Sequence, residues 1–298
     1  MRRWLVVSLV LFSLIGGFGT VGAEDDAFPA MPLDELGLPE IVVSTDGATM
    51  TAPTALEAGR YFLQVDNDSP AASVAVELYR APEGAAAADL IPGFQDAAGL
   101  DQPPPDFYEM LIAGGVSTEA GGRGEAVIDL PAGSWIVAAY VYGNGADGLL
   151  TQAIEVSGDI GDPDDPDADI DLNFEDFAFD LDERVPAGDQ VWELENDGEQ
   201  PHFVSIYSYG GELTEAAVNA ALFDAYGTAP QPVDPEAIPI DLGELVEVGG
   251  SGTMSAGTEA WLQLDLPVGT YLALCQVVDR ESGLPHAALG QLVIFTVE

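Results

Sequence analysis

The strongest constraint on the fold of this chain is an internal repeat. Residues 56–68 and 185–197 each contain an Ala-Gly turn, an alternating segment and an Asn-Asp pair. Further along, 128–139 (IDLPAGSWIVAA) is similar to 264–275 (LDLPVGTYLALC). The landmarks follow in the same order at similar spacing, which indicates a duplicated module. A chain of 298 residues is long enough for two such domains.

Each copy consists mostly of short runs with period-2 alternation, separated by Gly, Pro, Asn and Asp, which predicts antiparallel β-sandwiches. The predicted strands are Ile41–Ser44, Tyr61–Val65, Val74–Tyr79, Ala126–Leu130 and Trp135–Tyr142 in the first copy, and Phe174–Phe179, Gln190–Glu195, Phe203–Tyr207, Glu259–Leu264, Thr270–Cys275 and Gly290–Thr296 in the second. Residues 213–226 have apolar side chains at helical spacing, with Thr214 as a candidate N-cap. We therefore expect an all-β protein of two Greek-key sandwich domains with short helical insertions.

Residues 158–171 (GDIGDPDDPDADID) predict a solvated acidic linker, since they lack apolar periodicity and contain two prolines. The spaced aspartates lack the glycine and terminal glutamate of an EF-hand calcium loop. This linker would separate an N-terminal domain, 24–157, from a C-terminal domain, 172–298.

The N-terminus has the pattern of a secretory signal peptide, with two arginines, an apolar stretch from Trp4 and small residues up to Ala23. We expect cleavage after residue 23 and a secreted, periplasmic or extracellular protein. The alternative is an uncleaved segment that anchors the protein at the cell surface.

The charge balance is extreme, with 52 acidic residues against seven basic ones and a formal net charge of −45. Such a charge repels nucleic acids and anionic membranes, which makes both poor partners. It suits an exterior where salt or divalent cations screen charge.

One cysteine and two histidines occur in the chain, and all three lie in the second copy. Cys275 cannot form an internal disulfide. His202 opens one predicted strand, Cys275 closes another, and His286 lies in the loop before the last strand. A thiol and two imidazoles favour copper or zinc over magnesium or calcium.

Residues 170–298 resemble the cupredoxins, the copper-binding β-sandwich family, and in particular its exported bacterial members. The resemblance is carried by Gly269-Thr270-Tyr271, Cys275, Gly283-x-Pro285-His286, Gly290 and Gln291. It implies one copper ion with His202, Cys275 and His286 in a trigonal plane and Gln291 as a weak axial ligand. It also implies electron transfer or copper carriage, with a redox partner protein.

Two features differ from the family pattern. Gln291 stands where a methionine is usual, which is an acceptable axial variant that lowers the reduction potential. Ten residues separate Cys275 from His286, more than in the family's electron carriers. A long loop costs little to close, but it leaves the second imidazole less firmly preorganised.

Each site residue also has a purely structural interpretation. Cys275 could be a small buried apolar residue at a strand end, and both histidines could be ordinary turn or strand-start residues. The alternative function is then a metal-free extracellular binding or adhesion module whose copper site has decayed. The first copy has Ser73, Ala139 and, near Leu150, no histidine at the corresponding positions, so we expect it to bind no copper and to pack against the second copy or present a surface.

No enzyme motif is present: the chain lacks Gly-x-Ser-x-Gly and a phosphate-binding loop. Multicopper oxidases and nitrite reductases combine such modules, but they need further histidine clusters that two histidines cannot provide. We therefore expect a carrier rather than an enzyme.

Overall fold

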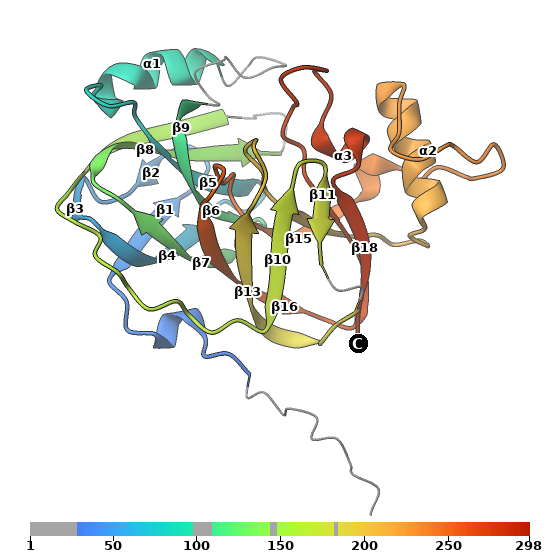
Figure 1. Cartoon of the computed structure of the whole chain (residues 1–298), viewed down its shortest axis with the longest axis horizontal. Helices are drawn as coiled ribbons and strands as arrows, with labels where there is room; N and C mark the ends of the chain where they lie inside the picture. Colours follow the sequence, from blue (N-terminus) through green and yellow to red (C-terminus); the bar gives the residue numbers. More distant parts are fainter. Residues whose placement is uncertain (1–28, 98–108, 144–147, 182–183) are drawn as a thin grey trace, which may run out of the picture.

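The computed structural model describes residues 29–97, 109–143, 148–181 and 184–298 (Figure 1). The predicted signal peptide, 1–23, lies outside the described residues. In the part of the chain that is described, no helix combines the length and apolar character that a membrane crossing requires.

The described residues form three β-sheets, one of eight strands and two of five. The first half contains β1 (Glu40–Thr45), β2 (Met50–Thr51), β3 (Ala55–Glu57), β4 (Gly59–Asn67), β5 (Ser73–Arg80), β6 (Leu111–Thr118), β7 (Arg123–Leu130), β8 (Gly133–Tyr142) and β9 (Gly148–Ser157). The second half contains β10 (Ile170–Glu175), β11 (Ala178–Asp180), β12 (Arg184–Val185), β13 (Gly188–Asn196), β14 (Ser205–Ser208), β15 (Val246–Gly250), β16 (Glu259–Leu266), β17 (Gly269–Leu274) and β18 (Leu292–Val297). The helices are α1 (Ala87–Ala97), α2 (Glu215–Tyr226) and α3 (His286–Leu289), with short 3-10 turns η1 (Leu33–Glu35) and η3 (Leu242–Glu244). The expected all-β class, with two sandwiches and short helices, is confirmed.

The two halves pair their strands in the same order. One layer is β2-β1-β4-β7 in the first half and β11-β10-β13-β16 in the second; the other layer is β3-β9-β8-β5-β6 and β12-β18-β17-β14-β15. Even the parallel pairs correspond, since β1 with β4 matches β10 with β13, and β3 with β9 matches β12 with β18. We call these halves the first and second units.

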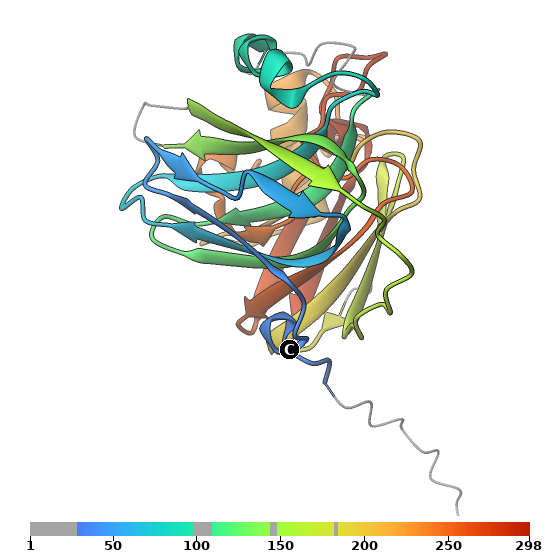
Figure 2. The same cartoon turned by 90° about the vertical axis from the view of Figure 1, so that its left-hand side faces the viewer.

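The two units share a sheet. β7 pairs antiparallel with β16, which joins two four-stranded layers into the eight-stranded sheet. The side-by-side arrangement is visible in Figure 2, where the blue-to-green strands lie against yellow-to-red ones. One hydrophobic core runs through both units and includes Ile128 of the first and Leu172 of the second. The first unit therefore packs against the second through its backbone as well as its side chains.

A buried asparagine explains the repeated Asn-Asp pair. The Asn67 amide donates to the carbonyls of Ala72 and Glu119, both at 2.8 Å. Asn196 in the second unit donates in the same way to the carbonyls of Gln200, at 3.0 Å, and Met254, at 2.8 Å. Each side chain thereby ties the loop after its strand to a distant segment.

Helix α2 begins and ends where the sequence predicts. The Thr214 hydroxyl accepts a hydrogen bond from the amide of Ala217, at 3.2 Å, and Gly227 ends the helix in the left-handed conformation, with φ 74°. Val218 and Leu222 pack into an apolar cluster with Leu272 of β17.

Some strand predictions differ from the structure. The predicted strand Phe174–Phe179 is a hairpin, since β10 and β11 pair with Glu175 opposite Ala178 around a two-residue tip, Asp176-Phe177. The predicted strand Phe203–Tyr207 begins at Ser205, and Cys275 lies just beyond β17 rather than closing it. Several strands were not predicted, among them β6 and β15. Each of these two strands contains two adjacent glycines, and glycine weakens the alternating pattern by which a strand is predicted.

The predicted linker contains no strand or helix between Ser157 and Ile170, and β10 begins within its last two residues. The linker is hydrogen-bonded to the first unit: Arg60 of β4 donates to the Asp164 carbonyl at 2.9 Å and to the Asp165 carboxylate at 2.7 Å.

Candidate metal centre

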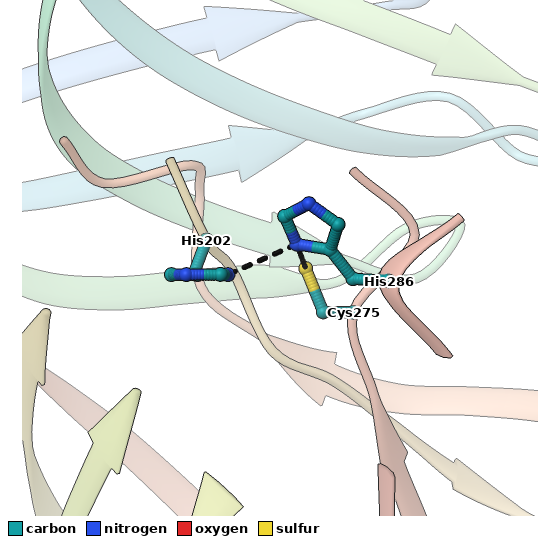
Figure 3. Close-up of side chains that lie close together, drawn as sticks. All are labelled: His202, Cys275 and His286. Carbon is teal, nitrogen blue, oxygen red and sulfur yellow. Dashed lines mark hydrogen bonds between the residues drawn. The ribbon is translucent and has the colours of Figure 1, made fainter. Parts of the chain in front are cut away.

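The cysteine and both histidines lie together in the second unit (Figure 3). His202 stands shortly before β14, Cys275 directly follows β17, and His286 begins α3. β14 and β17 are antiparallel neighbours with Ser205 opposite Leu274, so the start of one strand lies beside the end of the other. All three side chains are fully buried.

The Nδ1 atom of His286 lies at the middle of the group. It is 3.0 Å from Nδ1 of His202, 3.1 Å from Oε1 of Gln291 and 3.7 Å from Sγ of Cys275. The ligand atoms of the two histidines and the cysteine all lie within 4.8 Å of one another. The structure thus brings together all four side chains that the sequence singles out.

Backbone hydrogen bonds hold these positions in place. His202 forms a two-way bridge with Met254, with distances of 3.0 and 2.7 Å. The Cys275 amide donates to the Gln291 carbonyl at 3.1 Å, and the Cys275 carbonyl accepts from Ala287 at 2.8 Å. The backbone of Cys275 is therefore hydrogen-bonded to Gln291 and to Ala287, the residue after His286.

The long loop between Cys275 and His286 is a closed hairpin rather than the slack segment that its length predicts. The His286 amide donates to the Val277 carbonyl at 2.8 Å, and the Asp279 amide donates to the Leu284 carbonyl at the same distance. The Asp279 carboxylate accepts from the Ser282 amide at 2.7 Å. Local hydrogen bonds therefore close the loop on itself and hold His286 at its end.

Partners outside the group orient two of its side chains. Nε2 of His202 lies 3.0 Å from Oδ1 of Asp176, so this nitrogen carries the proton and Nδ1 presents its lone pair to the group. The Gln291 amide nitrogen donates to the carbonyls of Glu175, at 3.2 Å, and Ala178, at 3.3 Å. This leaves Oε1 of Gln291 directed at the group.

Burial keeps the group electrically neutral. It raises the pKa of the Cys275 thiol to about 12. Burial, reinforced by the nearby His202, lowers the pKa of His286 to about 4. Burial also lowers the pKa of His202, against the opposing effect of Asp176. At neutral pH the group therefore consists of a thiol and two neutral imidazoles, and a cation that binds would displace the thiol proton.

The geometry fits a small, soft metal ion. Bonds of about 2.0 Å to nitrogen and about 2.3 Å to sulfur place neighbouring atoms of a trigonal plane about 3.5 to 3.8 Å apart. The separation of 3.7 Å between Cys275 and His286 matches this spacing, and that of 3.0 Å between the imidazoles is somewhat shorter. A sulfur and two imidazoles suit copper or zinc, whereas calcium and magnesium require a shell of oxygens.

Among the described residues of the first unit, no comparable group occurs. Ser73 begins β5, where His202 precedes β14, and Ala139 lies in β8 where Cys275 follows β17. Ala139 and Leu150 are direct partners in the β8–β9 ladder. Apolar side chains, Ala139 and Leu150, thus occupy the positions in the first unit that correspond to Cys275 and to the neighbourhood of His286.

Asp176 is the site residue that the sequence does not reveal. It is one of 52 acidic residues, and it falls within a stretch that reads as one continuous strand. The only hint is the break in alternation at Asp176-Phe177, which coincides with the observed turn.

No protein-family model matches the chain, and no curated protein matches it. Among solved structures, an auracyanin from Roseiflexus castenholzii is 24% identical over 43% of this chain and 94% of its own, with a TM-score of 0.27. Auracyanin A from Chloroflexus aurantiacus, described as a blue copper protein, is 21% identical over 43% of this chain and 97% of its own, with a TM-score of 0.26.

A multicopper oxidase from Campylobacter jejuni is 11% identical and covers 89% of this chain and 64% of its own, with a TM-score of 0.24. At similarities this low, what the second unit binds has to follow from its own side chains.

Proposed function

We propose that this protein is an exported, cupredoxin-like copper protein that carries electrons or copper. One ion would be held by His202, Cys275 and His286, with Gln291 as the axial ligand. The observation that supports this most is the convergence of two imidazole nitrogens, one sulfur and one amide oxygen in a fully buried group.

Copper in such a set supplies one-electron chemistry between Cu(I) and Cu(II). The chain's own contribution is rigidity: the Met254 bridge, the closed 276–285 hairpin and the Asp176 contact keep the ligands in one arrangement. Burial excludes water from the centre. A site that does not rearrange between oxidation states suits electron carriage.

The proposal includes a redox partner protein and no catalytic reaction. An oxidase with several coppers requires more imidazoles than the two in this chain. With a net charge of −45, we expect the partner surface to carry positive charge, and association to slow as salt is added.

A copper titration of the purified mature protein tests the proposal. We expect one Cu(II) per chain with an intense visible thiolate-to-copper absorption, and loss of that absorption in Cys275→Ala. Ser73→Ala, at the matching position of the first unit, is the control and should retain both the colour and the stoichiometry.

Two results would overturn the proposal. Colourless binding that is equal in wild type and Cys275→Ala would place copper elsewhere. No specific binding at all would make the group a relic and would favour the metal-free binding or adhesion module.

A further inference from the structure

The tip of the β10–β11 hairpin lies against three of the four side chains of the metal centre. Asp176 contacts His202, and the carbonyls of Glu175 and Ala178 accept from Gln291. The Phe177 ring meets the His286 ring edge-on, with the centroids 5.1 Å apart. A four-residue segment thus contacts both imidazoles and the axial amide.

Asp176 makes its contact through one oxygen that is fixed from several directions. Oδ1 accepts from Nε2 of His202 at 3.0 Å and from the backbone amides of Glu199 and Gln200, at 3.0 and 3.2 Å. These amides hold the carboxylate in place independently of the histidine. The hydrogen bond to His202 is therefore a preset feature of the loop rather than a chance surface contact.

Gly198 gives this hydrogen bond the room it needs. A Cβ at that position would lie 2.6 Å from Nε2 of His202 and 2.7 Å from Oδ1 of Asp176. Any larger residue would separate the two atoms.

Backbone conformation at the tip also points to a functional constraint. Phe177 has φ 64° and is the one non-glycine residue with positive φ in the described part of the chain. A bulky residue in this region is unfavourable and persists where its surroundings require it. Here the Phe177 carbonyl lies so close to Gly290, next to the axial residue, that a Cβ at that position would be 2.9 Å from it.

The first unit shows what the same hairpin does without a metal centre. Its turn between β1 and β2 also begins with an aspartate, Asp46. That carboxylate accepts from the backbone amides of Ala48 and Thr49, at 2.9 and 2.7 Å, and so closes its own turn. Asp176 instead leaves its turn and reaches the 199–202 segment.

We propose that Asp176 is a positioning residue for the metal centre: it holds the proton of His202 on Nε2, so that Nδ1 faces the metal, and its negative charge favours Cu(II) over Cu(I). This rests on the proposed function for its redox part only. The same hairpin tip fixes Gln291 through two backbone carbonyls, so one turn orders ligands from two distant segments.

Three variants and one control separate charge from geometry. Asp176→Asn keeps an oxygen at Oδ1, where two backbone amides orient it, but removes the charge. Asp176→Ala removes both, and Gly198→Ala separates the two side chains while leaving the carboxylate. The control is Asp180→Asn, the same carboxylate-to-amide change at an exposed residue of the hairpin's second arm, β11.

The first measurement is the tautomer of His202 in the metal-free protein, from ring-nitrogen chemical shifts. The chain has two histidines, so the spectrum contains the ring-nitrogen signals of two imidazoles. The His286→Gln variant removes one set and so identifies the signals of His202. We expect the Nε2–H form in wild type, Asp176→Asn and Asp180→Asn, and loss of this preference in Asp176→Ala and Gly198→Ala. An unchanged tautomer in Asp176→Ala would overturn the positioning role.

The second measurement is the copper affinity and reduction potential. Removal of an outer hydrogen-bond partner typically weakens metal binding about 10–100-fold, and we expect this for Asp176→Ala. For Asp176→Asn we expect the preference for Cu(II) over Cu(I) to fall about tenfold, which raises the potential by about 59 mV. Values for Asp176→Asn equal to those of Asp180→Asn would overturn the charge effect. If wild type binds no copper, the proposed function fails, while the tautomer still decides whether Asp176 positions His202.

Discussion

At the residue scale, the two ends of the Gln291 amide contact different parts of the molecule. Its oxygen lies 3.1 Å from Nδ1 of His286, and its nitrogen is held by the carbonyls of Glu175 and Ala178. An amide can do both because it carries an acceptor and two donors on one rigid plane. A thioether could supply only the weak ligand.

We therefore expect Gln291→Met to raise the reduction potential of the copper-loaded protein. Sulfur is a softer axial ligand than an amide oxygen and favours Cu(I) more. Voltammetry on the purified protein measures this, with Gln95→Met on α1 as the control. A potential that falls or stays constant would show that Gln291 does not act as an axial ligand.

The ligand candidates could be found from the sequence because their residue types are rare in this chain. Two histidines and one cysteine leave no alternatives to choose among. Asp176 could not be found in this way, because it is one of 52 acidic residues and the break in alternation at Asp176-Phe177 does not show that its carboxylate reaches His202. Its contact depends on a turn that brings β10 back beside the 199–202 segment.

At the scale of elements, β6 and β15 meet across the two units through a half-buried acid, Glu247. The Glu247 carboxylate accepts from the hydroxyls of Ser117, at 2.8 Å, and Ser205, at 3.3 Å. Burial raises the pKa of Glu247, and the two serine hydrogen bonds only partly oppose this. The folded protein therefore binds this proton more tightly than the unfolded chain does.

The contribution of Glu247 to stability is fully present below the unfolded pKa, about 4.3 for Glu, and is lost as pH rises through the raised folded pKa. Glu247→Gln keeps an acceptor without the charge, so we expect it to stabilise the protein at neutral pH and to lose this advantage in acid. Denaturant unfolding at several pH values measures this, with exposed Glu244→Gln as the control. A variant that is less stable than wild type at pH 7 would contradict the prediction.

Helix α2 is a second element whose stability can be tested. Thr214→Ala removes the hydroxyl that accepts from the Ala217 amide, and loss of an N-cap costs about 1 kcal/mol. Thr228→Ala, just beyond the helix end, is the matched control. Equal unfolding free energies for the two variants would show that the cap does not stabilise the fold.

Helix α2 and the strongly alternating strands could be predicted because the information is local. The caps of α2 and the pattern of β13 lie within their own sequences. The adjacent glycines of β6 and β15 hide these strands, which form because the neighbouring strands offer hydrogen bonds. The hairpin at Asp176-Phe177 was missed because both of its arms, β10 and β11, alternate. The two arms therefore read as one continuous strand.

At the scale of the whole molecule, Arg60 ties the units and the connecting segment together. Its guanidinium binds Asp129 through two nitrogens, at 2.8 and 2.9 Å, and Asp165 at 2.7 Å. It also lies 4.3 Å from the ring centre of Trp261 on β16 of the second unit. Its side chain is 5% exposed.

We expect Arg60→Ala to lower the free energy of unfolding by about 1–3 kcal/mol. This is less than for a fully buried pair, because the carboxylates left behind are partly exposed and stay solvated. Arg184→Ala is the control, since its pair with Glu298 is exposed on both sides and should contribute less than about 1 kcal/mol. Equal losses in the two variants would contradict the role assigned to Arg60.

The β7–β16 pairing that joins the two units, which we call the seam, could not be predicted from sequence. β7 and β16 each have the alternating pattern of an ordinary sandwich strand, and neither shows whether its free side meets water or another strand. The repeat indicates two units, but pairing of Trp261 with Val127 depends on how the finished units fit together.

The seam also determines which strand edges remain open to other chains. Of the eight-stranded sheet, only β2 and β11 lie at the ends, with two and three residues. Edges this short offer few backbone groups on which a second molecule could add a strand. By pairing the long β7 with β16, the fold covers two strand edges that would otherwise be templates for amyloid-like growth.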